Sequence, residues 1–282
     1  MPTYLDKCNW KLSEVMSTNT PYSTGSRKSL GQHFLTDKTV IDQIIQAAEL
    51  THDDIVVEVG PGTGILTKHL ISTAGKIFSI ELDARLSQRL LTHLGRPDNL
   101  TCVTGDARFK DITDLVGNEV TYKMVSNLPY YAANPIIRRF LEVPPKPKCM
   151  VVMVQEEVAK AMVAEPGQMG LLSVAVQYYA KAQLVCRVSP QSFHPVPKVW
   201  SAVVKMEVYP TSPFLLEEPD PFFSFVKAGF RSPRKKLHNS LSRGLQIPAN
   251  CATELIEMSG LDPQSRPASL SIDNWIAMYS QW

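Results

Sequence analysis

The sequence predicts an α/β fold with a mainly parallel sheet, followed by a small all-α domain. Three observations support this fold class. Short apolar segments rich in β-branched residues alternate with helical patterns between Ile55 and Val163, which is the rhythm of βαβ units in a sheet covered on both faces. Two more strand-like segments follow without a long helix between them. After Pro210 the chain shows only helical periodicity.

The first of these strands, residues 55–59, runs into a loop with glycine at every second position, Gly60-Pro61-Gly62-Thr63-Gly64, and a helical pattern starts at Ile65. Glycines adopt positive φ and lack the Cβ atoms that keep a ligand away from the main chain. The free amides that open a helix favour an anionic or electron-rich group. The sequence therefore favours a ligand-binding turn; the alternative is a glycine turn that only packs a helix on the sheet.

The spacing of the glycines separates the candidate ligands. A dinucleotide-binding loop has the pattern G-x-G-x-x-G, and a P-loop has Lys-Ser/Thr after its last glycine, whereas this loop is G-x-G-x-G followed by Ile65. A second predicted strand, residues 76–81, ends in Glu81, whose carboxylate suits the two hydroxyls of a ribose. An acidic strand end beside an E-x-G-x-G-x-G loop resembles the nucleoside pocket of the Rossmann-like S-adenosyl-L-methionine (SAM) methyltransferases.

Predicted helices and strands alternate regularly around this loop. The helices cover residues 63–74, 84–94, 134–142 and 156–163, and the strands cover residues 76–81, 100–104, 122–126 and 149–155. Another helix, capped by Thr36 or Asp37, precedes the loop. The later strand-like segments 183–188 and 200–208 have no long helix between them, so we expect them to pair antiparallel at one edge of the sheet.

Prolines at positions 210, 213, 219 and 221 interrupt these patterns and mark the predicted domain boundary. We therefore divide the chain into a loose N-terminal extension (residues 1–26), a SAM-binding methyltransferase domain (residues 27–210) and a small helical domain (residues 211–282). The sequence gives no function for the extension.

The composition is typical of a cytoplasmic globular protein. Of 282 residues, 44% are apolar, enough for a sizeable core, and no apolar run approaches the about 20 residues that span a bilayer. We expect no membrane partner. The five cysteines are scattered without a C-x-x-C pair, which favours buried thiols over disulfides or a metal site. The net charge of +2 is too small to indicate a nucleic-acid partner, so any such signal is local.

Two more strand ends carry candidate functional residues. The third strand ends in Gly105-Asp106-Ala107, and the carboxyl ends of parallel strands meet at one rim of a sheet, so Asp106 is placed to accept a hydrogen bond from an adenine amino group; a helix cap is the alternative. The fourth strand ends in Asn127-Leu128-Pro129-Tyr130.

This tetrad suits methylation of the amino group of a base, a poor nucleophile because its lone pair is delocalised into the ring. The amide oxygen of Asn127 and the carbonyl of Leu128 can accept the two amino hydrogens and turn the lone pair toward a sulfonium methyl. Pro129 stiffens the loop, and Tyr130 offers a ring for stacking. The oriented carbonyls stabilise the positive charge that develops on nitrogen. The alternative is a β-turn with a solvent-exposed tyrosine.

Further residues are predicted to contact a nucleic-acid substrate. A flipped base is held between aromatic or apolar side chains. Tyr131 and Phe193 offer a second wall for such a base, and we place Phe193 in a proline-rich loop. Lys198 in the same loop is positioned for a phosphate. The segment Lys227–Arg243 contains no Asp or Glu and predicts a phosphate-contacting surface, although a solvated helix face is the alternative. Its candidate contacts are Arg231, Arg234, Lys235 and Lys236.

Together these motifs resemble the ribosomal RNA adenine dimethyltransferases, most closely the bacterial small-subunit type. The resemblance runs from Arg27 to the C-terminus. It is carried by the segments RKSLGQHFLTD (27–37), EVGPGTGILT (58–67), SIELD (79–83), GDA (105–107), NLPY (127–130), FHPVPKVWSAVV (193–204) and FRSPRKKLHNSL (230–241).

The resemblance implies a SAM-dependent enzyme that places two methyl groups on each of two adjacent adenosines in the 3′-terminal hairpin of 16S rRNA, acting as a monomer on a pre-30S particle. It also implies that the helical domain contacts rRNA. The residues that it implies for the SAM pocket are His33, Leu35, Gly60, Gly62, Glu81, Asp106 and Asn127. His33 and the run Tyr131–Pro135 differ from the pattern usual in this family.

Two other functions remain open on the sequence. One is an adenine methyltransferase of 23S rRNA of the macrolide-resistance type, although the Phe193 loop and the basic helical domain fit the small-subunit type better. The other is a binding protein or assembly factor that keeps the methyltransferase scaffold without its chemistry. Intact Glu81, Asp106 and Asn127 argue for catalysis.

Overall fold

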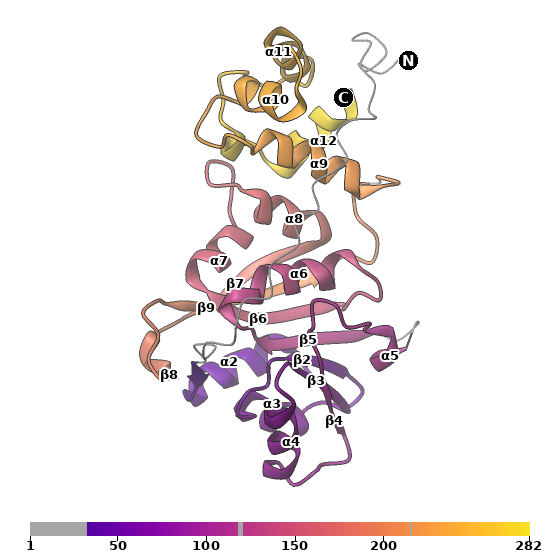
Figure 1. Cartoon of the computed structure of the whole chain (residues 1–282), viewed down its shortest axis with the longest axis vertical. Helices are drawn as coiled ribbons and strands as arrows, with labels where there is room; N and C mark the ends of the chain where they lie inside the picture. The colour runs from indigo at the N-terminus through magenta and orange to yellow at the C-terminus, as the bar shows by residue number, and fades with distance from the viewer. Residues whose placement is uncertain (1–32, 118–120, 215) are drawn as a thin grey trace. The chain divides into compact units, whose positions relative to one another are not determined.

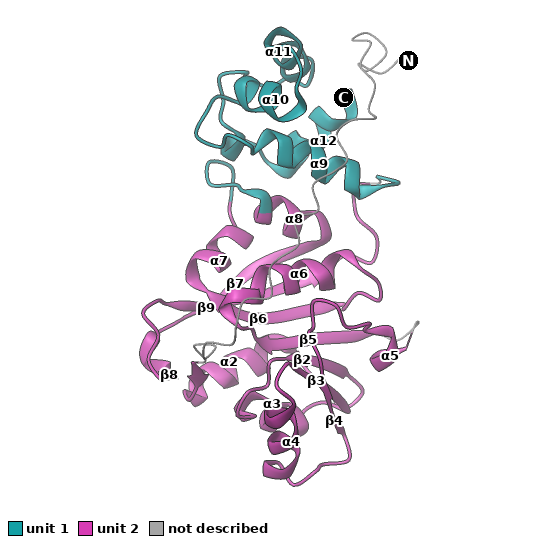
Figure 2. Ribbon diagram, in the orientation of Figure 1, with its two compact units in different colours: residues 1–32, 165–171, 216–282 teal, residues 33–164, 172–215 magenta. Residues whose placement is uncertain are grey.

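The computed structural model describes residues 33–117, 121–214 and 216–282 (Figure 1). The predicted N-terminal extension and the first six residues of the RKSLGQHFLTD segment, residues 27–32, lie outside the described residues. The chain forms two compact units (Figure 2). The described part of unit 1 comprises residues 165–171 and 216–282, and that of unit 2 comprises residues 33–117, 121–164 and 172–214.

Unit 2 contains the strands of the described chain, and from β2 to α7 its strands alternate with helices. The strands are β1 (Phe34–Leu35), β2 (Ile55–Val59), β3 (Lys76–Glu81), β4 (Leu100–Thr104), β5 (Tyr122–Asn127), β6 (Cys149–Gln155), β7 (Ala180–Val188), β8 (Phe193–His194) and β9 (Ser201–Val208). The helices are α2 (Lys38–Ala48), α3 (Ile65–Ile71), α4 (Ala84–His93), α5 (Thr113–Val116), α6 (Ala133–Glu142), α7 (Glu156–Met162) and α8 (Leu171–Tyr179), whose first residue belongs to unit 1.

The central sheet has the order β4-β3-β2-β5-β6-β9-β7 in the described chain. The first five strands of this order are mutually parallel, and β9 is antiparallel to both β6 and β7. The predicted fold class and the predicted antiparallel edge are therefore confirmed. Strands β2 and β5 are neighbours although β3 and β4 lie between them in the chain, so the chain changes direction across the sheet at β2, where ligands bind in open α/β sheets.

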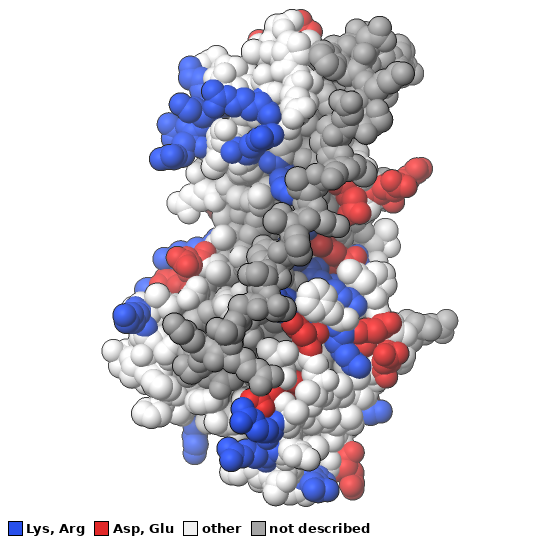
Figure 3. All heavy atoms as spheres, viewed as in Figure 1, with Lys and Arg blue, Asp and Glu red and all other residues white. Residues whose placement is uncertain are grey.

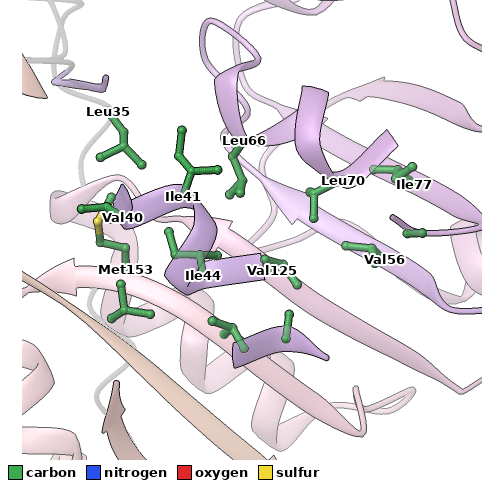
Figure 4. Packing of buried hydrophobic residues seen from close by; sticks show 14 of the residues in the cluster. Leu35, Val40, Ile41, Ile44, Val56, Leu66, Leu70, Ile77, Val125 and Met153 are labelled. Atoms are coloured by element: carbon green, nitrogen blue, oxygen red, sulfur yellow. The ribbon is translucent and has the colours of Figure 1, made fainter. Parts of the chain in front are cut away.

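Both faces of the sheet are buried at its centre, whereas the edge strands β4 and β7 are partly exposed. Every residue of β6 from Cys149 to Val154 is buried, which is expected of a parallel strand with helices on each side. One face packs against α2 and α3 in a continuous apolar cluster that includes Ile41, Ile44 and Leu70 (Figure 4). The helix α2 begins as predicted, because the carboxylate of Asp37 accepts a hydrogen bond from the Thr39 amide at 3.0 Å.

Unit 1 contains the helices of the C-terminal part. They are α9 (Pro219–Gly229), α10 (Leu237–Leu245), α11 (Ala249–Met258) and α12 (Ile272–Gln281). Trp275 and Phe222 are fully buried between them. Gly229 permits this packing, since a Cβ atom there would lie 2.4 Å from the Trp275 ring. The segment 165–171 joins this unit through hydrogen bonds from the Gly167 and Met169 amides to the Ala268 carbonyl. None of the described helices has the length and apolar character needed to cross a bilayer.

Candidate active site

The ends of four neighbouring strands form one rim of unit 2. Backbone hydrogen bonds continue beyond the strands: the Gly60 amide donates to the Ile80 carbonyl at 2.9 Å, the Gly105 amide to the Glu81 carbonyl at 2.9 Å and the Leu128 amide to the Met153 carbonyl at 3.1 Å. The first two hydrogen bonds join the chain after β2 and β4 to β3, and the third joins the chain after β5 to β6; the Val59 amide also joins β2 to β5 by donating to Ser126 Oγ at 2.9 Å. The glycine loop, Glu81, Asp106 and the tetrad all lie at these strand ends or in the loops that follow them.

The three glycines of the loop after β2 have positive φ, +71° at Gly60, +57° at Gly62 and +85° at Gly64, but they do not share one role. A Cβ atom on Gly64 would lie 2.3 Å from Leu90 Cδ1, so this glycine lets α3 pack on α4, which is the alternative that the sequence left open for the turn. A Cβ atom on Gly60 would face Pro129 at 3.5 Å and the Asn127 carbonyl at 3.8 Å. The loop therefore lies against the tetrad.

The carboxylate of Glu81 is tied to this loop. The side chain is 5% exposed; its Oε2 accepts from the Gly62 amide at 3.4 Å and its Oε1 from the Asp83 amide at 3.1 Å. Among the described residues each oxygen has one donor, and a carboxylate oxygen with one donor keeps a lone pair for a further hydrogen bond. This acceptor pair fits the two hydroxyls of a ribose.

Glu58 forms a buried polar centre beneath the loop. It is 1% exposed, and its Oε2 accepts from Thr67 Oγ1 at 2.8 Å and from Ser79 Oγ at 2.7 Å. Burial raises the pKa of this carboxyl to about 7, against the opposing effect of the two hydroxyls. The sequence signal for this centre is an acidic residue within a β-branched run.

The carboxylate of Asp106 is bound to Arg108, a contact that the sequence analysis missed. Oδ1 accepts from the Arg108 backbone amide and from Nε, each at 3.0 Å, and Oδ2 accepts from Nε at 3.0 Å and from Nη2 at 2.5 Å. These hydrogen bonds hold the pKa of Asp106 below its ordinary value. The signal in the sequence is a cation two residues after the acid, a spacing at which the side chain can fold back onto it.

The tetrad is held rigidly at the end of β5. Leu128 is 1% exposed, whereas Asn127 and Tyr130 are half-buried. The hydroxyl of Tyr130 is hydrogen-bonded to Ser201 Oγ at 2.5 Å. The Tyr130 ring lies within 26° of parallel to the His33 ring, with 6.4 Å between centroids. The tetrad is therefore not the solvent-exposed turn that was the alternative.

The segment His33–Leu35 reaches the site through pairing with a distant strand. In the antiparallel pair of β1 and β8, Phe34 lies opposite His194 and Leu35 opposite Phe193. His33 Nδ1 also donates to the Pro195 carbonyl at 2.7 Å. The Phe34 ring would lie 3.2 Å from a Cβ atom on Gly62, so this segment covers the glycine loop.

The predicted location and role of Phe193 are wrong. It lies in β8, not in a loop, and it is 2% exposed within the apolar cluster of the sheet. Its pairing with Leu35, also 2% exposed, turns the ring into the core. Phe193 therefore positions β1 and offers no exposed wall for a base.

The other predicted substrate contacts are exposed. Tyr131 is 58% exposed; partial burial and the negative charges of Asp106 and Glu81 raise the pKa of its phenol, which places this side chain within electrostatic range of the rim. Lys198 is exposed between β8 and β9. The predicted basic segment, residues 227–243, lies in unit 1, and Figure 3 shows Lys and Arg side chains gathered on one face of that unit. The exposed cations of the segment are Lys227, Arg231, Arg234, Lys235, Lys236 and Arg243.

The rim suits SAM. The glycine loop allows close approach of a ligand to the main chain, Glu81 offers two oxygens to a diol, and the negative charge of Glu81 favours a cationic ligand. In the described part of the chain, no group of His, Cys, Asp and Glu side chains is arranged to hold a metal ion.

Comparison with known proteins agrees with this site. A family model described as "Ribosomal RNA adenine dimethylase" matches residues 24–281. "Ribosomal RNA small subunit methyltransferase A" of Dehalococcoides mccartyi is 40% identical over 256 residues, which cover 90% of this chain and 87% of the relative. The protein of the same name from Clostridium botulinum is 39% identical over 256 residues, covering 90% of this chain and 93% of the relative.

Solved structures with the same architecture are also similar. A dimethyladenosine transferase from Plasmodium falciparum superposes with a TM-score of 0.73 at 27% identity, over 87% of this chain and 96% of the other. The 23S rRNA methyltransferase ErmE superposes with a TM-score of 0.70 at 26% identity, over 88% of this chain and 98% of the other. The match over nearly the whole chain, together with the arrangement of the rim, shows that this protein belongs to the ribosomal RNA adenine dimethylase family.

Proposed function

We propose that the protein is a SAM-dependent methyltransferase that dimethylates the N6 amino groups of two adjacent adenosines in the 3′-terminal hairpin of 16S rRNA, during maturation of the small subunit. The observation that carries the proposal is the contact of the tetrad with the glycine loop, in which Pro129 and the Asn127 carbonyl lie 3.5 Å and 3.8 Å from the Cβ position of Gly60. A methyl donor held by the loop therefore lies beside the carbonyls of the tetrad.

The cofactor is held by backbone at the loop and by carboxylates on either side. Gly60 and Gly62 admit it, Glu81 accepts from its ribose hydroxyls, and Asp106 accepts from its adenine amino group. His33 and the backbone of Leu35 close the pocket from β1, since the Leu35 side chain is buried in the core. When bound, SAM supplies an electrophilic methyl group on its sulfonium.

The target adenine is positioned by the tetrad. The Asn127 amide oxygen and the Leu128 carbonyl accept the two hydrogens of the amino group, so that its lone pair points to the methyl group, and the Tyr130 ring stacks on the base, a contact worth roughly 1–3 kcal/mol. The hydrogen bond to Ser201 fixes the orientation of that ring. The proton of the methylated amine passes to solvent or along a path that begins at Asn127. Tyr131 lies at the opening and Lys198 meets a phosphate.

The small subunit is the substrate that the relatives favour. The proteins at 39–40% identity carry the name of a small-subunit methyltransferase, whereas the 23S rRNA enzyme is 26% identical. Retention of the Glu81, Asp106 and Asn127 side chains favours an enzyme over a binding protein or assembly factor. We further propose that it acts in the cytoplasm as a monomer on a pre-30S particle, with the exposed cations of unit 1 on rRNA phosphates.

Replacing Asn127 tests the mechanism. We expect Asn127→Ala to lower the rate of methyl transfer from radiolabelled SAM to undermethylated small subunits by about a hundredfold or more, the loss seen when one oriented polar group of a transition state is removed. SAM affinity, measured by calorimetry, falls little. The matched control is Asn134→Ala, an exposed amide at the start of α6, which leaves both quantities unchanged. Wild-type turnover in Asn127→Ala would refute the role of the amide.

The substrate is tested in cells. In a strain that lacks the protein, primer extension across 16S rRNA loses the stop at the paired dimethyladenosines, and expression of the wild-type chain restores it. An unchanged stop in 16S rRNA together with a lost methylation in 23S rRNA would assign the enzyme to the large subunit.

A further inference from the structure

Arg108 occupies the carboxylate that the cofactor requires. In the described chain, Asp106 makes four contacts with three N–H groups of Arg108, at 2.5–3.0 Å: Oδ1 accepts from the backbone amide, Oδ2 accepts from Nη2, and the Nε–H is shared between both oxygens. An ionised carboxylate has about four lone-pair sites. The Arg108 side chain therefore donates to both oxygens and occupies most of the acceptor capacity of Asp106.

This arrangement disfavours adenine binding. If Asp106 accepts from the adenine amino group, as the proposed function requires, that group competes with the Arg108 side chain, which already donates to both oxygens. The backbone amide of Arg108 can stay, because the turn after β4 fixes it. The guanidinium can move, since the Arg108 side chain is 35% exposed and that of Asp106 is 25% exposed.

The guanidinium has another partner within reach. The Arg108 guanidinium carbon already lies 5.2 Å from the centre of the Phe109 ring, and Phe109 is 79% exposed. A cation over an aromatic face is attracted by the ring at this distance. The guanidinium that leaves Asp106 therefore keeps a favourable contact and gains access to water.

We propose that Arg108 is a positioning residue of the cofactor site that competes with the adenine of SAM for Asp106, and so sets both the affinity for the cofactor and its selectivity for the base. This inference rests on the proposed role of Asp106. Arg108 lowers the affinity for an adenine, whose amino group competes with the guanidinium for the carboxylate. It raises the affinity for a base with a carbonyl at the same position, because the guanidinium donates to that oxygen.

Calorimetry on the full chain with two probes tests the proposal: S-adenosylhomocysteine, and S-inosylhomocysteine, which carries a carbonyl in place of the amino group. We expect Arg108→Leu to bind S-adenosylhomocysteine about threefold to tenfold more tightly, as befits loss of a partly exposed ion pair. The same variant binds S-inosylhomocysteine more weakly than the wild type. The matched control Arg89→Leu, an exposed cation on α4, changes neither affinity.

Variants of Asp106 separate the two hypotheses. If Asp106→Asn binds S-adenosylhomocysteine as the wild type does, the proposed role of Asp106 fails. If Asp106→Asn binds weakly while Arg108→Leu matches the wild type with both probes, Asp106 keeps its role and the competition is overturned. Arg108→Leu has no effect in the Asp106→Asn background; tightening there would also overturn it.

A conservative variant guards against loss of the fold. Arg108→Lys keeps the charge but lacks the fork of donors, so it tightens S-adenosylhomocysteine binding by less than Arg108→Leu does. Thermal unfolding without ligand identifies folded variants. If Arg108→Leu does not fold, wild-type affinities in Arg108→Lys overturn the proposal.

Discussion

The carboxyl group of Glu58 is buried next to the glycine loop and has a raised pKa. Glu58 lies in β2, two residues before Gly60, and in the described chain it accepts from two hydroxyls, those of Thr67 and Ser79. Its pKa rises from an ordinary 4.5 to about 7 because the carboxyl is buried. A group whose pKa is raised on folding binds its proton more tightly in the folded state. The folded state therefore loses stability as the pH rises from about 4.5 through about 7.

Glu58→Gln should remove this dependence. The amide is neutral at every pH, so the free energy of unfolding of the variant should fall less than that of the wild type between pH 5 and pH 8, by an amount on the order of 3 kcal/mol. Urea denaturation at the two pH values measures it. The control is Glu157→Gln, an exposed carboxylate. If wild type and Glu58→Gln show the same pH profile, Glu58 is already ionised in the folded state at low pH.

Among the elements, β5 and α2 are joined by a buried lysine. Lys123, 8% exposed, donates to the Ala48 and Glu49 carbonyls at the end of α2, at 3.0 Å and 2.6 Å, and to Asp54 at 3.0 Å. Burial alone would raise the pKa of Asp54, but hydrogen bonds from Lys148, the Thr51 amide and Lys123 hold it well below its ordinary value. The cluster satisfies the open carbonyls of a helix end.

Lys123→Met should destabilise unit 2 by about 3 kcal/mol, because it leaves a buried carboxylate with fewer partners and two helix carbonyls without a donor. Urea denaturation measures the loss. The cluster lies at the amino end of the strands and the rim at the carboxyl end, so the folded variant binds S-adenosylhomocysteine normally. The control Lys181→Met removes an exposed lysine and changes little. Unaltered stability in Lys123→Met would mean that water replaces its contacts.

The sequence predicted best the elements that have a clear period. Strands β3, β4 and β6 have the predicted bounds, and helices α4, α6 and α7 differ from the prediction by one residue at one end, because alternation and helical spacing are local signals. Helices α5 and α8 were missed. Helix α5 has four residues, too few for a period. Helix α8 is buried nearly all round, so it shows little contrast between two faces, and it runs directly into β7.

The site residues that follow from local patterns were also predicted better than those that depend on contacts between distant segments. Strand ends placed Glu81, Asp106 and the tetrad at one rim, since the carboxyl ends of parallel strands meet there. The pairing of β1 with β8 depends on contacts between distant segments, and its strands have two residues each, too few for a period. Phe193 was misplaced for that reason. Whether Asp106 is bound by Arg108 depends on the turn geometry after β4, which the sequence does not specify.

For the whole molecule, the basic segment and the rim lie in different units. The exposed cations between Lys227 and Arg243 lie in unit 1, in a stretch without Asp or Glu, whereas the rim lies in unit 2. Three of these cations are consecutive, Arg234, Lys235 and Lys236, ahead of α10. Lys236 is hydrogen-bonded to Gln264, and all three side chains are exposed.

Neutralising these three cations to Gln should weaken binding to undermethylated small subunits and reduce the slope of log affinity against log salt by about 2 to 3, because fewer counterions are released. SAM affinity stays unchanged. The control replaces three exposed cations of unit 2, Lys68, Arg89 and Lys181, by Gln. If the triple variant of unit 1 binds with the wild-type slope, the segment is only a solvated surface.

The pairing of β1 with β8 has a consequence for biosynthesis. His33 and Pro195, which are hydrogen-bonded, are 162 positions apart, so the cover over the glycine loop cannot form before residue 195 has been synthesised. The ribosome must first release β8 from its exit tunnel. The strands β2 to β6 emerge earlier and can pair among themselves. Closure of the cover over the glycine loop is therefore a late step in the folding of the nascent chain.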